Sequence, residues 1–256
     1  MNKHTSIAVL LCAAVLSSCG TKTVQDITGP FPTARIKFFN FGVNAPGVNF
    51  YANSTKVTAI SSTTGTESVL GTAYSLPGAG GFYSAIAPGQ YALAGTIAAA
   101  TDKDLAIAKL NATIVDGKFY SFYLSGFYDP AAKAVDGFIV EDPFVAAIDY
   151  SVAYVRFVHA ISNANPLILY AKSTTTGTEV AVGSTVSYKA AGAFTALPNG
   201  VYDLSARYAG SATNAISRLA VSFIAGRVYT IGAFGDITIA SATATNRPRL
   251  DNTANR

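Results

Sequence analysis

The chain has 256 residues, of which 50% are hydrophobic and only 12% are charged. This composition excludes an intrinsically disordered protein, and the length suffices for one or two domains. Eighteen Lys and Arg against fourteen Asp and Glu give a net charge of +4, and the basic residues are dispersed singly along the chain. Because no basic stripe forms, the sequence does not predict a nucleic-acid-binding protein.

Residues 1–18 have the pattern of an export signal. Lys3 supplies the positive start, and residues 7–16 form an apolar run that is too short to span a bilayer. The run ends in Leu-Ser-Ser-Cys at residues 16–19, which looks like a bacterial lipobox. We expect cleavage before Cys19, lipidation of its sulfur, and a membrane anchor made of several acyl chains. The alternative is an ordinary secretory signal with an incidental cysteine.

Cleavage at this point limits the chemistry of the mature chain. Its remaining cysteine is the lipidated Cys19, and its remaining histidine is His159. An intrachain disulfide and a Cys/His zinc cluster are therefore not expected, and no cofactor is predicted. Gly20 is not an aspartate, which by analogy with lipoprotein sorting favours the outer membrane. Residues 19–32 are expected to form a lipidated polar tether.

The rest of the chain compares well with itself. Matching blocks recur in the same order in both halves, and the offset between them shrinks along the chain, so repeat 1 carries small loop insertions. Two long copies indicate a tandem duplication rather than a solenoid. The matching blocks are 34–40 (ARIKFFN) with 153–159 (AYVRFVH), 61–67 (SSTTGTE) with 173–179 (STTTGTE), and 117–120 (GKFY) with 226–229 (GRVY).

These matches define the expected domains. They are repeat 1 at 33–142, a linker at 143–151, repeat 2 at 152–242, and a polar C-terminal tail at 243–256. Within each copy the hydrophobic residues recur with a period of two, as in residues 34–40, which predicts half-buried β-strands. Closely spaced turn signals containing Gly, Pro and Asn separate the strands. We expect an all-β protein with two tandem antiparallel β-sandwiches, with a barrel as the alternative.

Several short motifs resemble a known family. Residues 156–160 (RFVHA), Pro166 and residues 198–204 (PNGVYDL) resemble a bacterial family catalogued as domain of unknown function 4397. Repeat 1 is similar through residues 36–40 (IKFFN) and 48–51 (VNFY). The resemblance implies an Ig-like or transthyretin-like β-sandwich in each copy, often exported or lipid-anchored, and no established reaction.

The chain departs from that family in its acidic positions. The family commonly has aspartates in the first long turn and the second strand. The corresponding residues here are Asn44, Asn49, Asn163 and Ile168. This departure argues against calcium binding or acid catalysis in that loop.

The candidate polar sites each have a simpler structural interpretation. His159 aligns with Asn40, and both side chains can bond buried backbone groups. Glu67 and Glu179 recur in threonine-rich turns that lack the further carboxylates that calcium requires. The remaining acidic groups are Asp102 with Asp104, and Glu141 with Asp142. They are expected to lie in a solvated loop and in a solvated hinge, respectively, rather than to form a glycosidase pair.

An aromatic segment is the most distinctive feature. Residues 119–123 (FYSFY) place aromatic side chains on both faces of a strand, whereas repeat 2 has VYTIG at 228–232. Phe119 and Tyr123, with Tyr128 beyond them, could stack on a sugar or another flat ligand. The favoured interpretation is that Phe119 and Tyr123 instead pack against repeat 2 or the linker.

The sequence thus favours a non-catalytic, lipid-anchored cell-envelope protein with a binding or structural role. The expected partners are the membrane, through the lipid anchor, and an envelope glycan or protein. A carbohydrate-binding module that uses Phe119, Tyr123 and Tyr128 is the first alternative. A hydrolase of envelope polymers is the second.

Overall fold

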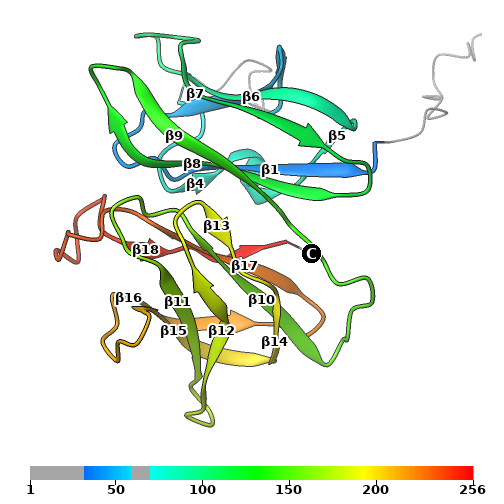
Figure 1. Cartoon of the computed structure of the whole chain (residues 1–256), viewed down its shortest axis with the longest axis vertical. Coiled ribbons are helices and arrows are strands. Elements are labelled where there is room, and N and C mark those ends of the chain that lie inside the picture. Colours follow the sequence, from blue (N-terminus) through cyan, green and yellow to red (C-terminus); the bar gives the residue numbers. More distant parts are fainter. Residues whose placement is uncertain (1–31, 59–69, 256) are drawn as a thin grey trace, which may run out of the picture. The chain divides into compact units, whose positions relative to one another are not determined.

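The computed structural model describes residues 32–58 and 70–255. The predicted signal, Cys19 and the turn that contains Glu67 lie outside these residues. Within the described part of the chain, no helix is long and apolar enough to cross a membrane. Residues 32–256 form one compact unit that contains both repeats (Figure 1).

Repeat 1 consists of two sheets that enclose a hydrophobic core. One sheet has the order β4-β1-β8-β9, with β5 also pairing β1, and the other has the order β3-β2-β6-β7. The strands are β1 (Ala34–Asn40), β2 (Val48–Ala52), β3 (Thr55–Lys56), β4 (Leu76–Pro77), β5 (Ser84–Ile86), β6 (Gly89–Ile97), β7 (Ala106–Ile114), β8 (Phe119–Asp129) and β9 (Ala134–Glu141). A 3-10 turn, η1 (Gly78–Gly81), follows β4.

Repeat 2 follows the same plan. Its sheets have the orders β13-β10-β17-β18, with β14 pairing β10 and β19 pairing β17, and β12-β11-β15-β16. The strands are β10 (Val152–His159), β11 (Leu167–Ser173), β12 (Glu179–Val186), β13 (Ala190–Ala191), β14 (Thr195–Pro198), β15 (Gly200–Tyr208), β16 (Ile216–Phe223), β17 (Val228–Phe234), β18 (Arg249–Leu250) and β19 (Thr253–Ala254).

The prediction of an all-β protein built from sandwiches is confirmed. Each repeat has its own core of alternating apolar side chains from its two sheets. The sheets are antiparallel except for one parallel pair in each repeat, β1 with β8 and β10 with β17. Each parallel pair joins the first strand of a repeat to a long strand near the C-terminal end of that repeat.

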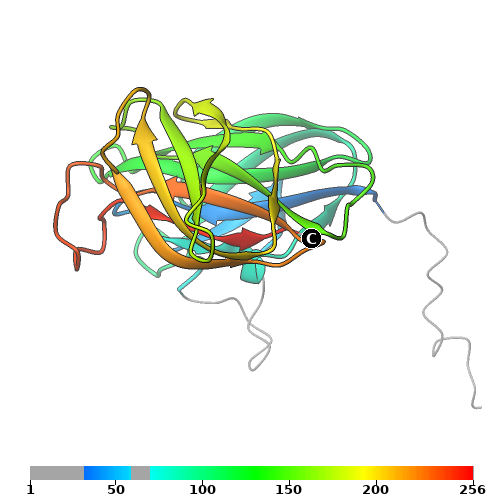
Figure 2. The same ribbon diagram turned by 90° about the horizontal axis from the view of Figure 1, so that it is seen from below.

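Two sequence-based expectations need correction. The segment 243–256 is not simply a polar tail, because β18 and β19 pair with β17 and complete the sheet of repeat 2 (Figure 2). In addition, strand β1, which was expected to be half-buried, is buried on both faces, as are β8, β10 and β17. Their second face is covered because the two repeats pack together through these sheets. A third cluster of buried residues, drawn from both repeats, lies at this contact.

Candidate functional site: a buried polar network between the repeats

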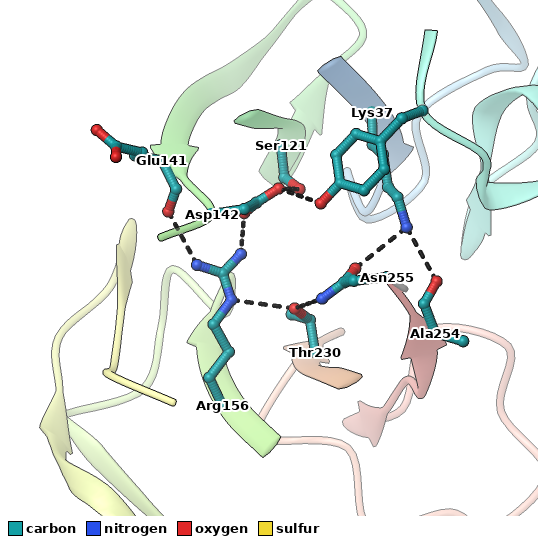
Figure 3. A network of polar contacts seen from close by, with 9 residues as sticks. Lys37, Ser121, Glu141, Asp142, Arg156, Thr230, Ala254 and Asn255 are labelled. Atoms are coloured by element: carbon teal, nitrogen blue, oxygen red, sulfur yellow. Dashed lines mark hydrogen bonds and ion pairs between the residues drawn. The ribbon is translucent and has the colours of Figure 1, made fainter. Parts of the chain in front are cut away.

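The repeats are joined by a network of polar side chains whose charged members are buried (Figure 3). Lys37 of β1, Asp142 just after β9, and Arg156 of β10 have exposures of 1%, 2% and 0%. Burying charged groups is unfavourable unless they are paired and hydrogen-bonded. The contacts of these three residues therefore determine whether the interface is stable.

Arg156 of repeat 2 reaches across to the end of β9 in repeat 1. Its Nη2 forms an ion pair with Asp142 Oδ1, and its Nη1 donates to the Glu141 carbonyl at 2.9 Å. Its Nε donates to Thr230 Oγ1 of β17 at 3.0 Å, so all three guanidinium nitrogens have an acceptor. These three contacts hold the planar guanidinium in one orientation. The contacts with Asp142 and Glu141 thereby fix repeat 2 against repeat 1.

Asp142 is the acceptor at the centre of the network. Besides Arg156, its carboxylate accepts hydrogen bonds from Ser121 Oγ at 2.8 Å and from the Tyr83 hydroxyl at 2.6 Å. Burial and the nearby Asp142 carboxylate raise the pKa of Tyr83, so the hydroxyl keeps its proton and remains a donor. The expectation that Asp142 lies in a solvated hinge is wrong, because repeat 2 covers it.

Lys37 makes the reciprocal contact from repeat 1 to the last strand of repeat 2. Its Nζ donates to the Ala254 carbonyl at 3.0 Å and to Asn255 Oδ1 at 3.1 Å, and it lies 4.2 Å from the centre of the Tyr83 ring. These acceptors are neutral. Burial lowers the pKa of Lys37 from 10.5 to about 8, and Asp142 only partly counteracts this effect.

The two halves of the network are equivalent by sequence and by strand register. Lys37 pairs with Ser121 across β1 and β8, and Arg156 pairs with Thr230 across β10 and β17. Asp142 N donates to Phe119 O, and Asn255 N donates to Val228 O, both at 2.7 Å. The contact therefore has approximate two-fold symmetry, like the isologous interface of a homodimer. The symmetry is broken where Asp142 in repeat 1 corresponds to Asn255 in repeat 2.

Aromatic residues extend the same contact. Tyr123 is 1% exposed and lies between two rings, stacked on Phe39 at 4.5 Å and on Phe138 at 5.0 Å between centroids. Phe41 of repeat 1 stacks on Phe234 of repeat 2 at 4.4 Å. These contacts bury aromatic surface from both repeats, which adds apolar stabilisation to the polar network.

The structure does not bring the three predicted ligand-binding rings together. Both faces of Tyr123 are covered. Phe119 packs on Phe144 of the linker and on Tyr83, at 4.8 and 5.2 Å between centroids. Tyr128 is partly buried against the core of repeat 1. The placement of Tyr123 and Phe119 agrees with packing against repeat 2 and the linker, whereas Tyr128 packs within repeat 1, and the three rings share no stacking platform.

His159 anchors a loop. Its Nδ1 accepts from the Ile161 N–H and its Nε2 contacts the Asn165 carbonyl, both at 3.2 Å, and burial lowers its pKa. The equivalent Asn40 donates to the carbonyls of Pro46 and Thr72 at 3.0 and 2.9 Å. Both side chains thus bond backbone groups of the loop that follows their strand, and Asn40 also bonds the more distant Thr72.

The other acidic candidates lie at the surface in ion pairs. Glu179 bonds both terminal nitrogens of Arg207 at 2.6 and 2.7 Å, and Arg207 lowers its pKa. Asp102 pairs with Lys133 at 2.5 Å. Within residues 32–58 and 70–255, no three His, Cys, Asp or Glu side chains are grouped so that they could hold a metal ion.

Comparisons with known proteins add little to this geometry. No protein-family model matches the chain, and a search of curated proteins finds no match. Among solved structures, the chain is similar to one described as a "putative cell adhesion protein" from Bacteroides ovatus ATCC 8483, at 12% identity over 89% of this chain and 97% of that one. The TM-score is 0.22, which supports no conclusion about this chain.

Proposed function

We propose that the chain is a non-catalytic, lipid-anchored protein of the cell envelope, held at the outer membrane, with a binding or structural role. One observation supports the non-catalytic part of this proposal. The buried ionisable side chains Lys37, Asp142, Arg156 and His159 all bond to groups that join the repeats or fix a loop. A side chain held in this way contributes to a rigid body and is not poised for proton transfer to a substrate.

The proposed role follows from how the repeats are joined. Two sandwiches fixed to each other form a single rigid unit, and the connecting loops at the ends of the strands can contact a partner. We propose an envelope glycan or protein as that partner, and the membrane as the attachment point through lipidated Cys19. We also propose that the two repeats belong to the family of domain of unknown function 4397, on the motifs of residues 156–160 and 198–204.

The anchor is tested by mass spectrometry of the protein extracted from the membranes of an expressing bacterium. We expect an N-terminal Cys19 that carries acyl chains, and we expect a Cys19→Ser variant that is neither acylated nor retained in the membrane. An exported chain with an unmodified thiol would contradict the anchor.

The non-catalytic role is tested separately on a soluble fragment that starts at Thr21. This fragment contains the whole compact unit, residues 32–256. We expect no release of soluble products from purified envelope polymers during prolonged incubation. Turnover that persists in a preparation purified by two independent methods would instead support the hydrolase alternative.

A further inference from the structure

The C-terminal segment of repeat 2 forms one wall of a pocket. The pocket has a volume of about 370 Å³ and is lined by residues 247–251, Ser217 and Arg218 of β16, Phe234 of β17, and Ser75 of repeat 1. The loop between β17 and β18 runs from 235 to 248, whereas its counterpart between β8 and β9 spans only 130–133. The pocket is therefore a feature of repeat 2 that the duplication alone does not explain.

Three arginines face this pocket, and each is held by a backbone carbonyl. Arg218 Nη1 donates to Leu250 O at 2.8 Å, Arg247 Nη1 donates to Ala244 O at 3.1 Å, and Arg249 Nη2 donates to Thr245 O at 2.5 Å. The Arg249 guanidinium also lies over the Phe234 ring at 5.2 Å. These contacts fix the guanidinium groups, while each still has N–H donors to offer, because a guanidinium carries five.

The charge of these arginines is not balanced locally. Arg156 and Arg207 form ion pairs with carboxylates, but in the described part of the chain no ion pair involves Arg218, Arg247 or Arg249. Asp251 also lines the pocket, yet its Oδ2 accepts the Thr253 hydroxyl at 2.6 Å, and one carboxylate cannot neutralise three cations. The Tyr74 hydroxyl interacts with the Arg249 guanidinium, but this group is neutral and does not balance the charge of the arginine.

We propose that this pocket binds an oxyanion, a carboxylate or phosphate group carried by a small molecule. Planar guanidinium groups match both chemistries through paired hydrogen bonds, and the hydroxyls of Ser75 and Ser217 add neutral donors at the rim. The inference rests on the proposed binding role and adds the chemistry of the ligand. The lipid anchor and the absence of turnover are tested in separate experiments. A negative result in either of them is therefore distinguishable from a failure of the pocket to bind an oxyanion.

The test compares three sugars that differ in one group. Glucuronate carries a carboxylate, glucose 6-phosphate carries a phosphate, and glucose carries neither. Binding to the fragment from Thr21 onward is measured by titration calorimetry at constant ionic strength. We expect saturable binding of at least one charged sugar and none of glucose. The charged sugar that binds more tightly identifies whether the pocket prefers a carboxylate or a phosphate.

Matched variants locate the binding. Arg218→Gln and Arg247→Gln each remove one pocket cation, and we expect each to weaken binding by about tenfold, as expected for the loss of a charge-assisted hydrogen bond. Arg227→Gln removes the same charge from an exposed turn outside the pocket and should leave the affinity unchanged. Circular dichroism and thermal melting verify that the variants are folded. No saturable binding of either charged sugar, or equal weakening by all three substitutions, would overturn the proposal.

Discussion

Lys37 and Arg156 occupy equivalent positions in the two repeats, and each crosses the contact to bond the last strand segment of the other repeat. The exchange is reciprocal, but only Arg156 meets a carboxylate. The contact therefore buries two cations with one anion, and the interaction energies on its two sides must differ. This difference leads to predictions about the stability of the chain.

Asp142→Asn should be strongly destabilising. The substitution keeps the size of the side chain, but it leaves the guanidinium of Arg156 buried without a counter-ion. Breaking a buried pair in this way typically costs about 3–5 kcal/mol. Urea denaturation measures the change. Because the chain has no tryptophan, unfolding is followed by far-ultraviolet circular dichroism. Glu141→Gln, which removes a surface ion pair with Lys118, is the matched control and should change little. Equal midpoints for the two variants would contradict the assigned role of Asp142.

Asn255→Asp should be stabilising at neutral pH. It gives Lys37 the counter-ion that Arg156 already has, and Thr230 can donate its hydroxyl to the new carboxylate, as Ser121 does to Asp142. We expect a gain of about 1.5–3 kcal/mol in the free energy of unfolding, the range for a hydrogen bond to a charged group. The gain should disappear in the background of Lys37→Met, which a double-mutant cycle measures. A gain of the same size without Lys37 would show that another group is responsible.

Lys37 should make stability depend on pH in the alkaline range. Its pKa is about 8 in the folded chain against 10.5 ordinarily. Between these values the unfolded chain holds more protons, so the free energy of unfolding should rise with pH, by at most about 1.4 kcal/mol per pH unit. The buried tyrosines act in the opposite direction above about pH 10, because their pKa values are raised in the folded state. Urea titrations between pH 8 and about pH 9.5 therefore isolate the lysine.

Lys37→Met is the control for this pH dependence. A methionine fills a similar volume without a titrating group. The free energy of unfolding of the variant should therefore rise much less between pH 8 and about pH 9.5 than that of the wild-type chain. Parallel slopes for the wild-type chain and Lys37→Met would contradict the assignment of the effect to Lys37.

Strand β1 shows how far the sequence could predict this contact. The period of two correctly placed Ile36 and Phe38 in the core of repeat 1, with Lys37 and Phe39 on the other face. The period identifies which residues share a face, but it does not identify what covers that face. Lys37 and Phe39 are 1% and 2% exposed because repeat 2 covers them, a contact between segments far apart in the sequence.

A signal for the network was nevertheless present in the repeat alignment. It pairs Lys37 with Arg156 and Ser121 with Thr230, which keeps a cation and a hydroxyl at matching places on the non-core face. Asn255 could not be found in this way, because β18 and β19 are two residues each and follow a long loop. Strands of that length carry no readable periodicity, and their pairing with β17 depends on tertiary contacts.

Tyr123→Ala should reduce stability rather than abolish binding of a sugar. The ring is stacked between Phe39 and Phe138, so its removal leaves a cavity at the contact between the repeats, and the loss should be about 3–5 kcal/mol. Tyr150→Ala, at a tyrosine that is 81% exposed, is the control and should change the free energy of unfolding by less than about 0.5 kcal/mol. Urea denaturation measures both variants, and polysaccharide pull-down is run alongside. If Tyr123→Ala retained wild-type stability but lost a polysaccharide bound by the wild-type chain, the ring would be a ligand contact, and its assignment to the interface would be wrong.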